Sequence, residues 1–315
     1  MTLLTDVRDA DRFAFGDDRE AADLAALPPD VAWAWRTLAG VAPAWRIRGA
    51  ELGAWDGPVV VVAHAPASQF GRLQERLAAG DALPDLLAAV ALEGSRFRGQ
   101  RGRVWAALPG NLHLSVHLTL DLPAADVQAA LAVLPAVATA RAIERASRGA
   151  VRPGLKWVND LLLADRKVGG VLSASHVDGG RVRHLLLGIG VNVAARPDLP
   201  ASPRALPPTR LADHDPRFLG PAAWGRLLPP LLDELAVARA ALSVDHGVAL
   251  VDAYRDRAAF LGRHVAIWPV DDGDDPAAQP LARGVVEALL PDLSLRIRGV
   301  PEPVRHGRMT LDPAP

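Results

Sequence analysis

Hydrophobic and polar residues alternate strictly between residues 111 and 120. Leucine or valine fills every even position, while the odd positions hold polar side chains, including His113 and His117. This alternation predicts a strand with one buried face and one polar face. The following segment, residues 123–148, is rich in alanine and leucine, with Asp126 near its start and arginines near its end. That pattern predicts a helix whose charges match its dipole.

The same reasoning predicts the other elements. Short apolar runs bounded by turn residues predict strands, here at 58–64, 155–163, 168–176 and 183–193. The second and third of these form a hairpin around an Ala-Asp-Arg-Lys turn. Helical spacing of apolar residues predicts helices at 68–79, 221–242 and 246–261.

Three parts follow one another along the chain. Residues 1–50 form an N-terminal extension of unassigned role, whose tryptophans predict a packed segment. Residues 51–261 contain the mixture of strands and helices described above. From residue 262 to 315 the pattern changes to short strands between polar turns, which predicts a small barrel.

Composition excludes several classes of protein. Acidic and basic residues nearly cancel, to a net charge of -1, which argues against a generally basic nucleic-acid binder. The chain has no cysteine, which excludes disulfides, iron–sulfur clusters and a cysteine nucleophile. The N-terminus lacks the apolar stretch of a signal peptide, and polar residues interrupt the long apolar segment 122–143. We therefore expect a cytoplasmic protein with no membrane span.

The distribution of lysine is uneven. Lysine and arginine together number 35, and the only two lysines are Lys156 and Lys167. An ammonium differs from a guanidinium where a compact charge must meet a carboxylate or a phosphate. Chance on an arginine-rich background is the alternative explanation for this pair, but for Lys156 we favour a functional role.

An arginine-rich loop, residues 94–105, is a second candidate for chemistry. It carries four arginines with glycines between them. Glycines let the backbone approach a ligand, and arginines offer forked donors to phosphate or carboxylate oxygens. The loop therefore suggests an anion cradle. A solvated turn and a nucleic-acid patch are the alternatives, and the neutral net charge weakens the second.

The segment from Lys156 to Asp160 is a third candidate. In a continuous strand these two residues share a face, and an ion pair between them is the plain structural explanation. Gly188-Ile-Gly-Val-Asn192 lacks the third glycine of a dinucleotide-binding fingerprint, and no phosphate-loop motif occurs. His113 and His117 lack a third metal ligand nearby in sequence, so a polar strand face explains them.

Taken together, five motifs follow the order found in the biotin protein ligases of the biotin/lipoate ligase superfamily, and the chain resembles that family over roughly residues 58–312. They are Arg98-Gly-Gln-Arg-Gly-Arg-Val-Trp105, Gly110-Asn-Leu-His-Leu-Ser115, Lys156-Trp-Val-Asn-Asp160, Lys167-Val-Gly-Gly-Val-Leu172 and Gly188-Ile-Gly-Val-Asn192. The resemblance implies an α+β fold. Its parts are a class II aminoacyl-tRNA synthetase-like catalytic domain, with a mixed sheet and helices, and a small C-terminal SH3-like β-barrel.

The resemblance also implies a reaction. Biotin and ATP, with Mg²⁺, would form biotinyl-5′-AMP, and the biotinyl group would pass to a lysine of the biotin carboxyl carrier domain of a biotin-dependent carboxylase. Lys156, Arg98 and Arg101 are implied as catalytic residues, and no residue is assigned to the metal. The resemblance implies a cytoplasmic enzyme without DNA or membrane as partner, and it allows a homodimer.

The residues that the resemblance places around ATP and biotin come from all five motifs and from the start of the 68–79 helix. They are Ser68, Gln69, Gly94, Arg98, Gly99, Gln100, Arg101, Gly102, Arg103, Trp105, Asn111, Lys156, Asn159, Asp160, Lys167, Gly169, Gly170, Gly188, Gly190 and Asn192.

The loop departs from the family pattern at three positions. Aligned without gaps from Trp105, the family's glutamine falls on Gly94, its first glycine on Phe97 and its second arginine on Gln100. These departures keep two alternatives open: a related ligase for lipoate or octanoate, and a non-catalytic paralogue that binds an adenylate or a carrier protein.

Overall fold

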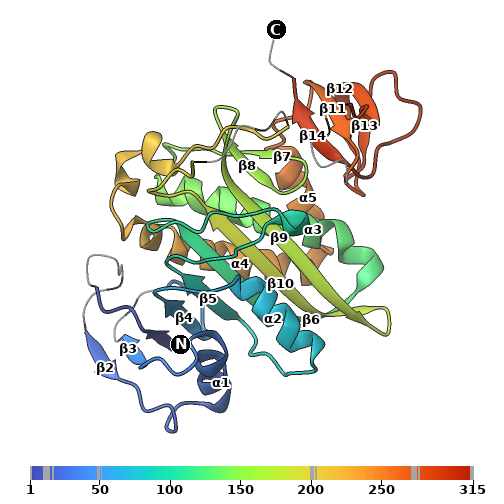
Figure 1. Cartoon of the computed structure of the whole chain (residues 1–315). Coiled ribbons are helices and arrows are strands. Elements are labelled where there is room, and N and C mark those ends of the chain that lie inside the picture. Colours follow the sequence, from blue (N-terminus) through green and yellow to red (C-terminus); the bar gives the residue numbers. More distant parts are fainter. Residues whose placement is uncertain are drawn as a thin grey trace.

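The computed structural model describes residues 2–9, 15, 18–47, 50, 52–198, 202, 204–270, 275 and 277–312. A ten-stranded mixed sheet forms the centre of the larger part of the molecule (Figure 1). Its strands are β1 (Leu3–Thr5), β2 (Arg19–Ala21), β3 (Trp45–Ile47), β4 (Val59–Val62), β5 (Leu87–Ala91), β6 (Leu112–Pro123), β7 (Gly154–Lys156), β8 (Asp160–Leu163), β9 (Arg166–Asp178) and β10 (Arg181–Val191). They lie in the order β2-β3-β1-β4-β5-β6-β10-β9-β8-β7.

Helices pack on both faces of this sheet. They are α1 (Pro29–Leu38), α2 (Gln69–Ala78), α3 (Ala124–Ala146), α4 (Leu228–Asp245) and α5 (Val248–Arg255). Helices α3, α4 and α5 share one hydrophobic core with one sheet face, and α1 and α2 share a second core with the other face. Strand β4 shows why both are needed: Val59 and Val61 belong to the first core, and Val60 and Val62 to the second. A strand buried on both faces reads as a continuous apolar run.

Strand β6 confirms the predicted alternation. Its even-numbered residues, such as Leu114 and Val116, lie in the core beneath α3. His113 and Ser115 point to the opposite face, beyond the part that α1 and α2 cover, and line a cavity there. The polar face of this strand is therefore the floor of a site.

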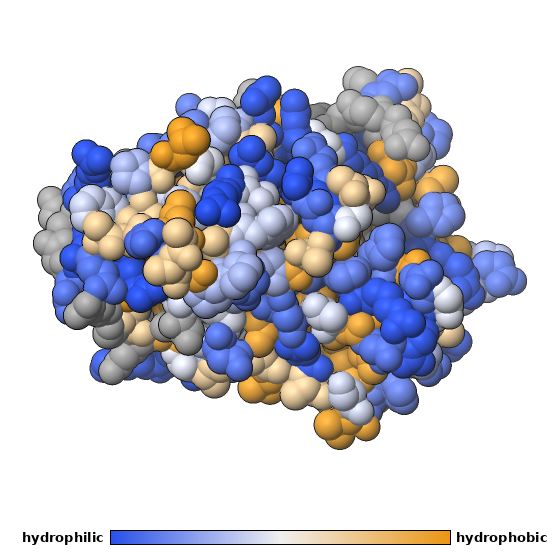
Figure 2. Space-filling model, turned by 90° about the horizontal axis from the view of Figure 1, so that it is seen from below, coloured by the Kyte–Doolittle hydropathy of each residue, from blue (hydrophilic) through white to orange (hydrophobic). Residues whose placement is uncertain are grey.

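Helix α3 is the core helix of the protein. By length and composition this helix could span a membrane, but 72% of its most apolar 18-residue stretch is buried inside the fold. Its apolar length is thus explained by the sheet and the helices around it. On the face seen in Figure 2, hydrophilic residues predominate and hydrophobic ones form small groups among them.

The first three strands of the chain, β1, β2 and β3, belong to the main sheet. Strand β1 pairs in parallel with β4 and antiparallel with β3, which in turn pairs with β2. The Trp35 side chain on α1 is fully buried in the second core. The first residues of the chain therefore lengthen the sheet at the edge away from β7 (Figure 1).

The last part of the chain forms a separate four-stranded antiparallel sheet, drawn in orange and red in Figure 1. Its strands are β11 (His264–Trp268), β12 (Ala282–Leu289), β13 (Leu295–Ile297) and β14 (Arg308–Leu311). These short strands agree with the pattern of short strands and polar turns predicted for residues 262–315.

Two predicted helices are shorter than expected. A short 3₁₀ turn, Ala223–Arg226, precedes α4, which begins only at Leu228. Helix α5 ends at Arg255 because the chain after it pairs with β7: Leu155 N donates to Arg257 O, and Ala259 N donates to Leu155 O. A pairing across about 100 residues overrides the local helical pattern.

Candidate active site

A cavity of about 790 Å³ opens on the sheet face that α1 and α2 leave uncovered. Strands β6, β9 and β10 form its floor, and the arginine-rich loop and the β7–β8 turn form two walls. Pro197, Ser202, residues 204–206 and Pro208, together with residues 305–309 at the start of β14, complete it. Segments that are far apart in the sequence thus meet around one space.

The turn between β7 and β8 builds the charged wall. The predicted single strand at 155–163 is wrong, because the chain reverses at Trp157–Asn159 and makes Lys156 and Asp160 cross-strand partners. The indole Nε1 of Trp157 donates to the carbonyl of Leu293, 2.8 Å away in the turn between β12 and β13, and so anchors the reversal. The ion pair therefore arises from a hairpin and not from side chains sharing a strand face.

Both lysines of the chain meet at Asp160. Lys156 Nζ lies 2.8 Å from one carboxylate oxygen, and Lys167 Nζ lies 2.6 Å from the other. Lys156 is 7% exposed. Burial alone would raise the pKa of Asp160, but the two ammonium groups outweigh it and hold that pKa well below its usual value. The two lysines carry two positive charges and Asp160 carries one negative charge. This excess of positive charge can attract a further anion.

Glycines in β10 let aromatic rings pack closely against the floor of the cavity. A Cβ on Gly190 would lie 2.4 Å from the Trp105 ring, and a Cβ on Gly188 would lie 3.2 Å from Phe70. The two glycines are alternate residues of β10, so both face the cavity. Lys167 Nζ lies 5.8 Å from the centre of the Trp105 ring. The two glycines of the G-I-G motif therefore leave room for aromatic rings to pack in the cavity. This role differs from that of a phosphate-binding loop.

His113 is held as a neutral ring. Trp105 Nε1 donates to His113 Nδ1 at 3.3 Å, and Nε2 then donates to the carbonyl of Leu108 at 3.2 Å. Burial lowers the pKa of His113 to about 4, against an opposing effect of the Leu108 carbonyl. At neutral pH both ring nitrogens are thus engaged and uncharged.

The arginine-rich loop is a narrow turn and not a strand. Arg98 and Val104 form an antiparallel bridge, and Arg101 takes a left-handed conformation (φ 60°) between them. Arg98 Nη1 donates to Gly102 O at 3.2 Å, and Arg103 Nε donates to Gln100 O at 3.3 Å. The three arginines are exposed to solvent and line the cavity. Guanidinium groups there can approach an anion in the cavity.

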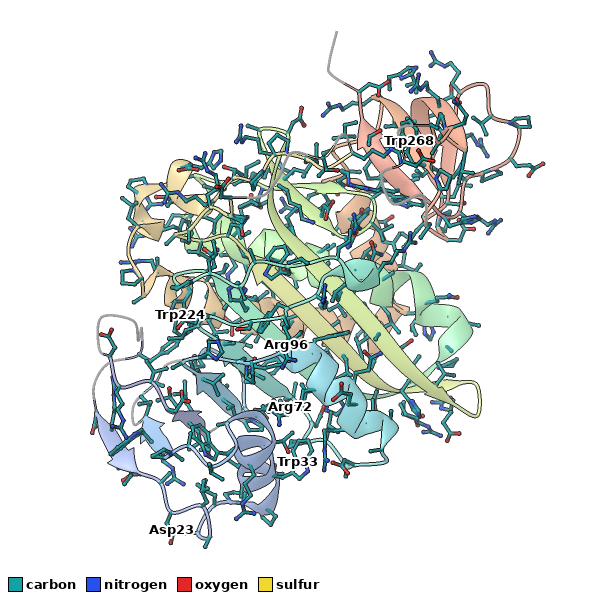
Figure 3. The ribbon with its side chains drawn as sticks, viewed as in Figure 1. Asp23, Trp33, Arg72, Arg96, Trp224 and Trp268 are labelled. Carbon is teal, nitrogen blue, oxygen red and sulfur yellow. The ribbon has the colours of Figure 1, made fainter. Side chains whose placement is uncertain are left out.

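Sequence reasoning missed one wall of the cavity. The guanidinium of Arg204 lies 4.0 Å from the centre of the Trp268 ring and donates to the carbonyl of Asp275 at 2.6 Å. Trp268 belongs to the C-terminal sheet (Figure 3), so this contact joins that sheet to the loop bordering the cavity. No local signal in the sequence could reveal a pair 64 residues apart.

The comparisons with known proteins agree with this geometry. Residues 79–192 match the model of the biotin/lipoate A/B protein ligase family. Over 171 residues the chain is 35% identical to the biotin–[acetyl-CoA-carboxylase] ligase of Paracoccus denitrificans, covering 53% of this chain and 69% of that protein. The chain belongs to the biotin protein ligases.

Other relatives of this ligase are larger or more distant. The bifunctional ligase/repressor BirA of Bacillus subtilis is 32% identical over 139 residues, which cover 44% of this chain and 42% of BirA. The biotin protein ligase from Aquifex aeolicus, solved in complex with biotin and ATP, has a TM-score of 0.61 at 19% identity. That comparison covers 81% of this chain and 98% of the other, and it shows that the fold is shared.

Most predicted site residues of the ligase line the cavity. These are Ser68, Arg98, Gly99, Gln100, Arg101, Arg103, Trp105, Lys156, Asn159, Asp160, Lys167, Gly170, Gly188, Gly190 and Asn192. Lys156, Arg98 and Arg101 therefore converge on one space, although they come from different elements. Phe70, Phe97, His113 and Arg204, which are not among the predicted site residues, also line it.

Five predicted residues lie outside the lining. The Asn111 side chain accepts from the backbone N–H groups of Val193 and Ala195, so it fixes the chain after β10. The others pack behind the cavity or lie at the loop tip: Gln69, Gly94, Gly102 and Gly169. Their contact with ligand stays a prediction.

Replacing Gly190 by alanine should disturb the cavity floor. The added Cβ overlaps the Trp105 ring, and overpacking of this kind costs about 1–3 kcal/mol. We expect a lower free energy of unfolding in denaturant and weaker ligand binding. Gly71→Ala is the matched control, because Gly71 lies in α2 with nothing within 4 Å, so alanine should be neutral or stabilising. Equal effects of both substitutions would contradict this account of the floor.

Proposed function

We propose that this ligase activates biotin with ATP and transfers the biotinyl group to a lysine of a biotin carboxyl carrier domain. One observation carries the proposal: the buried Lys156 ammonium stands beside Lys167 on the wall of a cavity that arginines line on another side. The P. denitrificans relative is named for biotin and acetyl-CoA carboxylase, which supports the choice of acid and acceptor.

In the first step a carboxylate oxygen of biotin attacks the α-phosphorus of ATP. The bond from that phosphorus to the bridging oxygen breaks, and pyrophosphate leaves with the bonding electrons. The product is the mixed anhydride biotinyl-5′-AMP. Two anions approach one another in this step, so fixed positive charge at the meeting point lowers the barrier. Lys156 supplies it, and the hydrogen bond to Asp160 orients its ammonium group.

The arginine-rich loop would hold the phosphates and exclude water. Arg98, Arg101 and Arg103 are exposed on a turn beside the cavity, within which Gly99 and Gly102 permit movement. Closure over the adenylate would protect the anhydride from hydrolysis. Gln100 stands where the family pattern has an arginine, and Arg101, in its left-handed turn, would take over that contact.

In the second step the neutral amine of an acceptor lysine attacks the acyl carbon. The bond from that carbon to the phosphate oxygen breaks, AMP leaves, and the new amide forms as the nitrogen loses a proton. Nothing in this step requires a nucleophile from the ligase itself. The role of the chain is to hold the adenylate with its acyl carbon open to the carrier.

Mg²⁺ would enter with ATP. In the part of the chain that the structure describes, no group of three or more histidine, aspartate or glutamate side chains could hold a metal ion. ATP phosphates and water would therefore supply the ligands, as is common for Mg²⁺.

Further features of the family complete the proposal. The large sheet would be the class II synthetase-like catalytic domain, and the four-stranded C-terminal sheet its SH3-like domain. The cytoplasmic location, the homodimer and the absence of DNA as a partner stay predictions. Size-exclusion chromatography with light scattering, with and without biotin and ATP, tests the homodimer.

The proposal is tested by pyrophosphate release from ATP with the purified chain, with and without biotin. We expect release only when biotin, ATP and Mg²⁺ are all present, with the acyl-adenylate detectable by mass spectrometry. A folded protein that releases no pyrophosphate under these conditions contradicts the proposed first step.

A further inference from the structure

The ligase carries only two side-chain amines, and both lie where the proposed anhydride would form. Lys156 and Lys167 are the only lysines of the chain, and both line the cavity. The other strongly basic side chains are arginines, whose guanidinium groups do not lose a proton in proteins. Formation of a stable amide on a side chain of the ligase is therefore confined to these two residues.

An acyl-adenylate can react with the protein that makes it. A mixed anhydride acylates a neutral amine that is held near its acyl carbon, because holding the reactants together removes most of the entropic cost of their meeting. The acceptor lysine of the carrier has to be brought to this place. Lys156 is there already, since the proposed function puts its nitrogen beside the biotin carboxylate and the α-phosphate.

One carboxylate engages both of these nitrogens. Lys156 Nζ donates to Asp160 Oδ2 at 2.8 Å, and Lys167 Nζ lies 2.6 Å from Asp160 Oδ1. An ammonium nitrogen has no lone pair, so neither lysine can attack a carbonyl carbon while it forms this ion pair. In the part of the chain that the structure describes, no other carboxylate pairs with either lysine.

The neighbouring phenol of Tyr254 cannot replace this carboxylate. The Tyr254 side chain is fully buried, and its hydroxyl has no hydrogen-bond partner among the described residues. Burial, and after it the charge of Asp160, raise the pKa of Tyr254 well above its usual value. The phenol therefore stays neutral, and Asp160 is the counter-charge for both lysines.

The balance of charge is closest while the anhydride is bound. The phosphate of the adenylate and the carboxylate of Asp160 then supply two negative charges for the two lysines. Without Asp160, one phosphate would face two ammonium groups, and like charges at close range disfavour the charged form. One nitrogen would lose its proton more readily and become a nucleophile, as an amine does beside a second cation.

We propose that Asp160 directs the biotinyl group to the carrier by preventing both lysines of the ligase from reacting with the adenylate. The carboxylate thus determines which amine is acylated, in addition to orienting Lys156. The inference rests on the proposed function, because the adenylate is the acyl donor.

The reaction that Asp160 prevents has a defined course. A neutral lysine nitrogen attacks the acyl carbon, and the bond from that carbon to the phosphate oxygen breaks. AMP leaves with the bonding electrons, and the nitrogen gives its proton to water. The product is an amide on Lys156 or Lys167, which would occupy the cavity and end further turnover.

The first test follows acylation of the ligase itself, without a carrier. Synthetic biotinyl-5′-AMP is added to the unaltered chain and to Asp160→Asn, and peptide mass spectrometry measures the biotinylated fraction of each lysine. Adding the adenylate removes any dependence on the first half-reaction. We expect the fraction modified at the two lysines to be at least about tenfold greater in Asp160→Asn. Asp165→Asn is the matched control, because Asp165 pairs with Arg263 at the surface, and should behave as the unaltered chain.

A second measurement needs no substitution and applies even where Asp160→Asn does not fold. A trace of acetic anhydride labels the folded, unaltered chain at mildly alkaline pH, together with Nα-acetyl-lysine amide as the reference amine. The Lys167 side chain is 32% exposed, so the reagent can reach it. We expect Lys167 to react at least about tenfold more slowly than the reference, and at the reference rate once urea has unfolded the chain.

The outcomes separate this inference from the proposed function. Equal acylation of the unaltered chain and Asp160→Asn, or no acylation of either lysine in a folded Asp160→Asn, overturns the inference and leaves the function standing. Labelling of Lys167 in the folded chain at the reference rate also overturns the inference. A lack of biotin-dependent pyrophosphate release overturns the proposed function alone, because the added adenylate still tests the protection by Asp160.

Discussion

Replacing Lys156 by methionine lowers biotin-dependent pyrophosphate release by about a hundredfold to a thousandfold. Removing one preorganised positive group from a transition state that gathers negative charge costs about this much. Methionine keeps the length and apolar stem of the side chain. Asp160 keeps Lys167 as a partner at 2.6 Å, so the fold should survive. Steady-state kinetics with thermal unfolding of the same samples measure both effects.

Lys167→Met is the matched control, because Lys167 is the only other lysine and meets the same carboxylate. Its side chain is 32% exposed, against 9% for that of Lys156. Solvent screens it more, so we expect a smaller loss of rate. If Lys156→Met retained full activity, or if Lys167→Met cost more, the central role of Lys156 would be wrong.

Asp160→Asn is expected to give the largest loss of stability. The substitution leaves two ammonium groups side by side with no counter-charge in a buried site. Breaking a buried ion pair by removing one partner costs about 3–5 kcal/mol. Unfolding in urea at neutral pH measures this loss. Asp165→Asn is the control: Asp165 pairs with Arg263 at the surface with 56% of its side chain exposed, and should change stability by less than about 1 kcal/mol.

The pH dependence provides a second check on Asp160. Its pKa in the folded chain lies well below its usual value, because the pull of the lysines exceeds the effect of burial. The stabilisation is therefore fully present above the unfolded pKa of about 3.9 and is lost as pH falls below it. The stability difference between the unaltered chain and Asp160→Asn should shrink between neutral pH and about pH 3. A constant difference would contradict the ion-pair explanation.

Local patterns predicted much of the sheet and its helices. Strands β6 and β10 and helices α2 and α3 carry their periodicity within a single segment, so their burial could be read from spacing. The same holds for the apolar run of β4, which lies between two cores. The motifs also predicted that residues from distant segments would share one site, and the cavity brings most of them together.

The other features of the structure depend on tertiary contacts that no local sequence pattern reveals. The reversal at Trp157 is fixed by a hydrogen bond to Leu293, 136 residues away. The early end of α5 follows from pairing with Leu155. The packing of the Phe97 ring against Gly94, where a Cβ would lie 2.4 Å from it, could not be predicted from the motif alone. Each of these is a tertiary contact that overrides local preference.

The most direct test of the central claim is the mass of a biotin carboxyl carrier domain after incubation with the chain, biotin, ATP and Mg²⁺. We predict that the carrier gains one biotinyl group on its acceptor lysine, and that Lys156→Met leaves the carrier mass unchanged over the same time. A carrier that stays unmodified with the folded, unaltered chain, or one that is modified equally by Lys156→Met, would contradict the claim that this cavity joins biotin to protein.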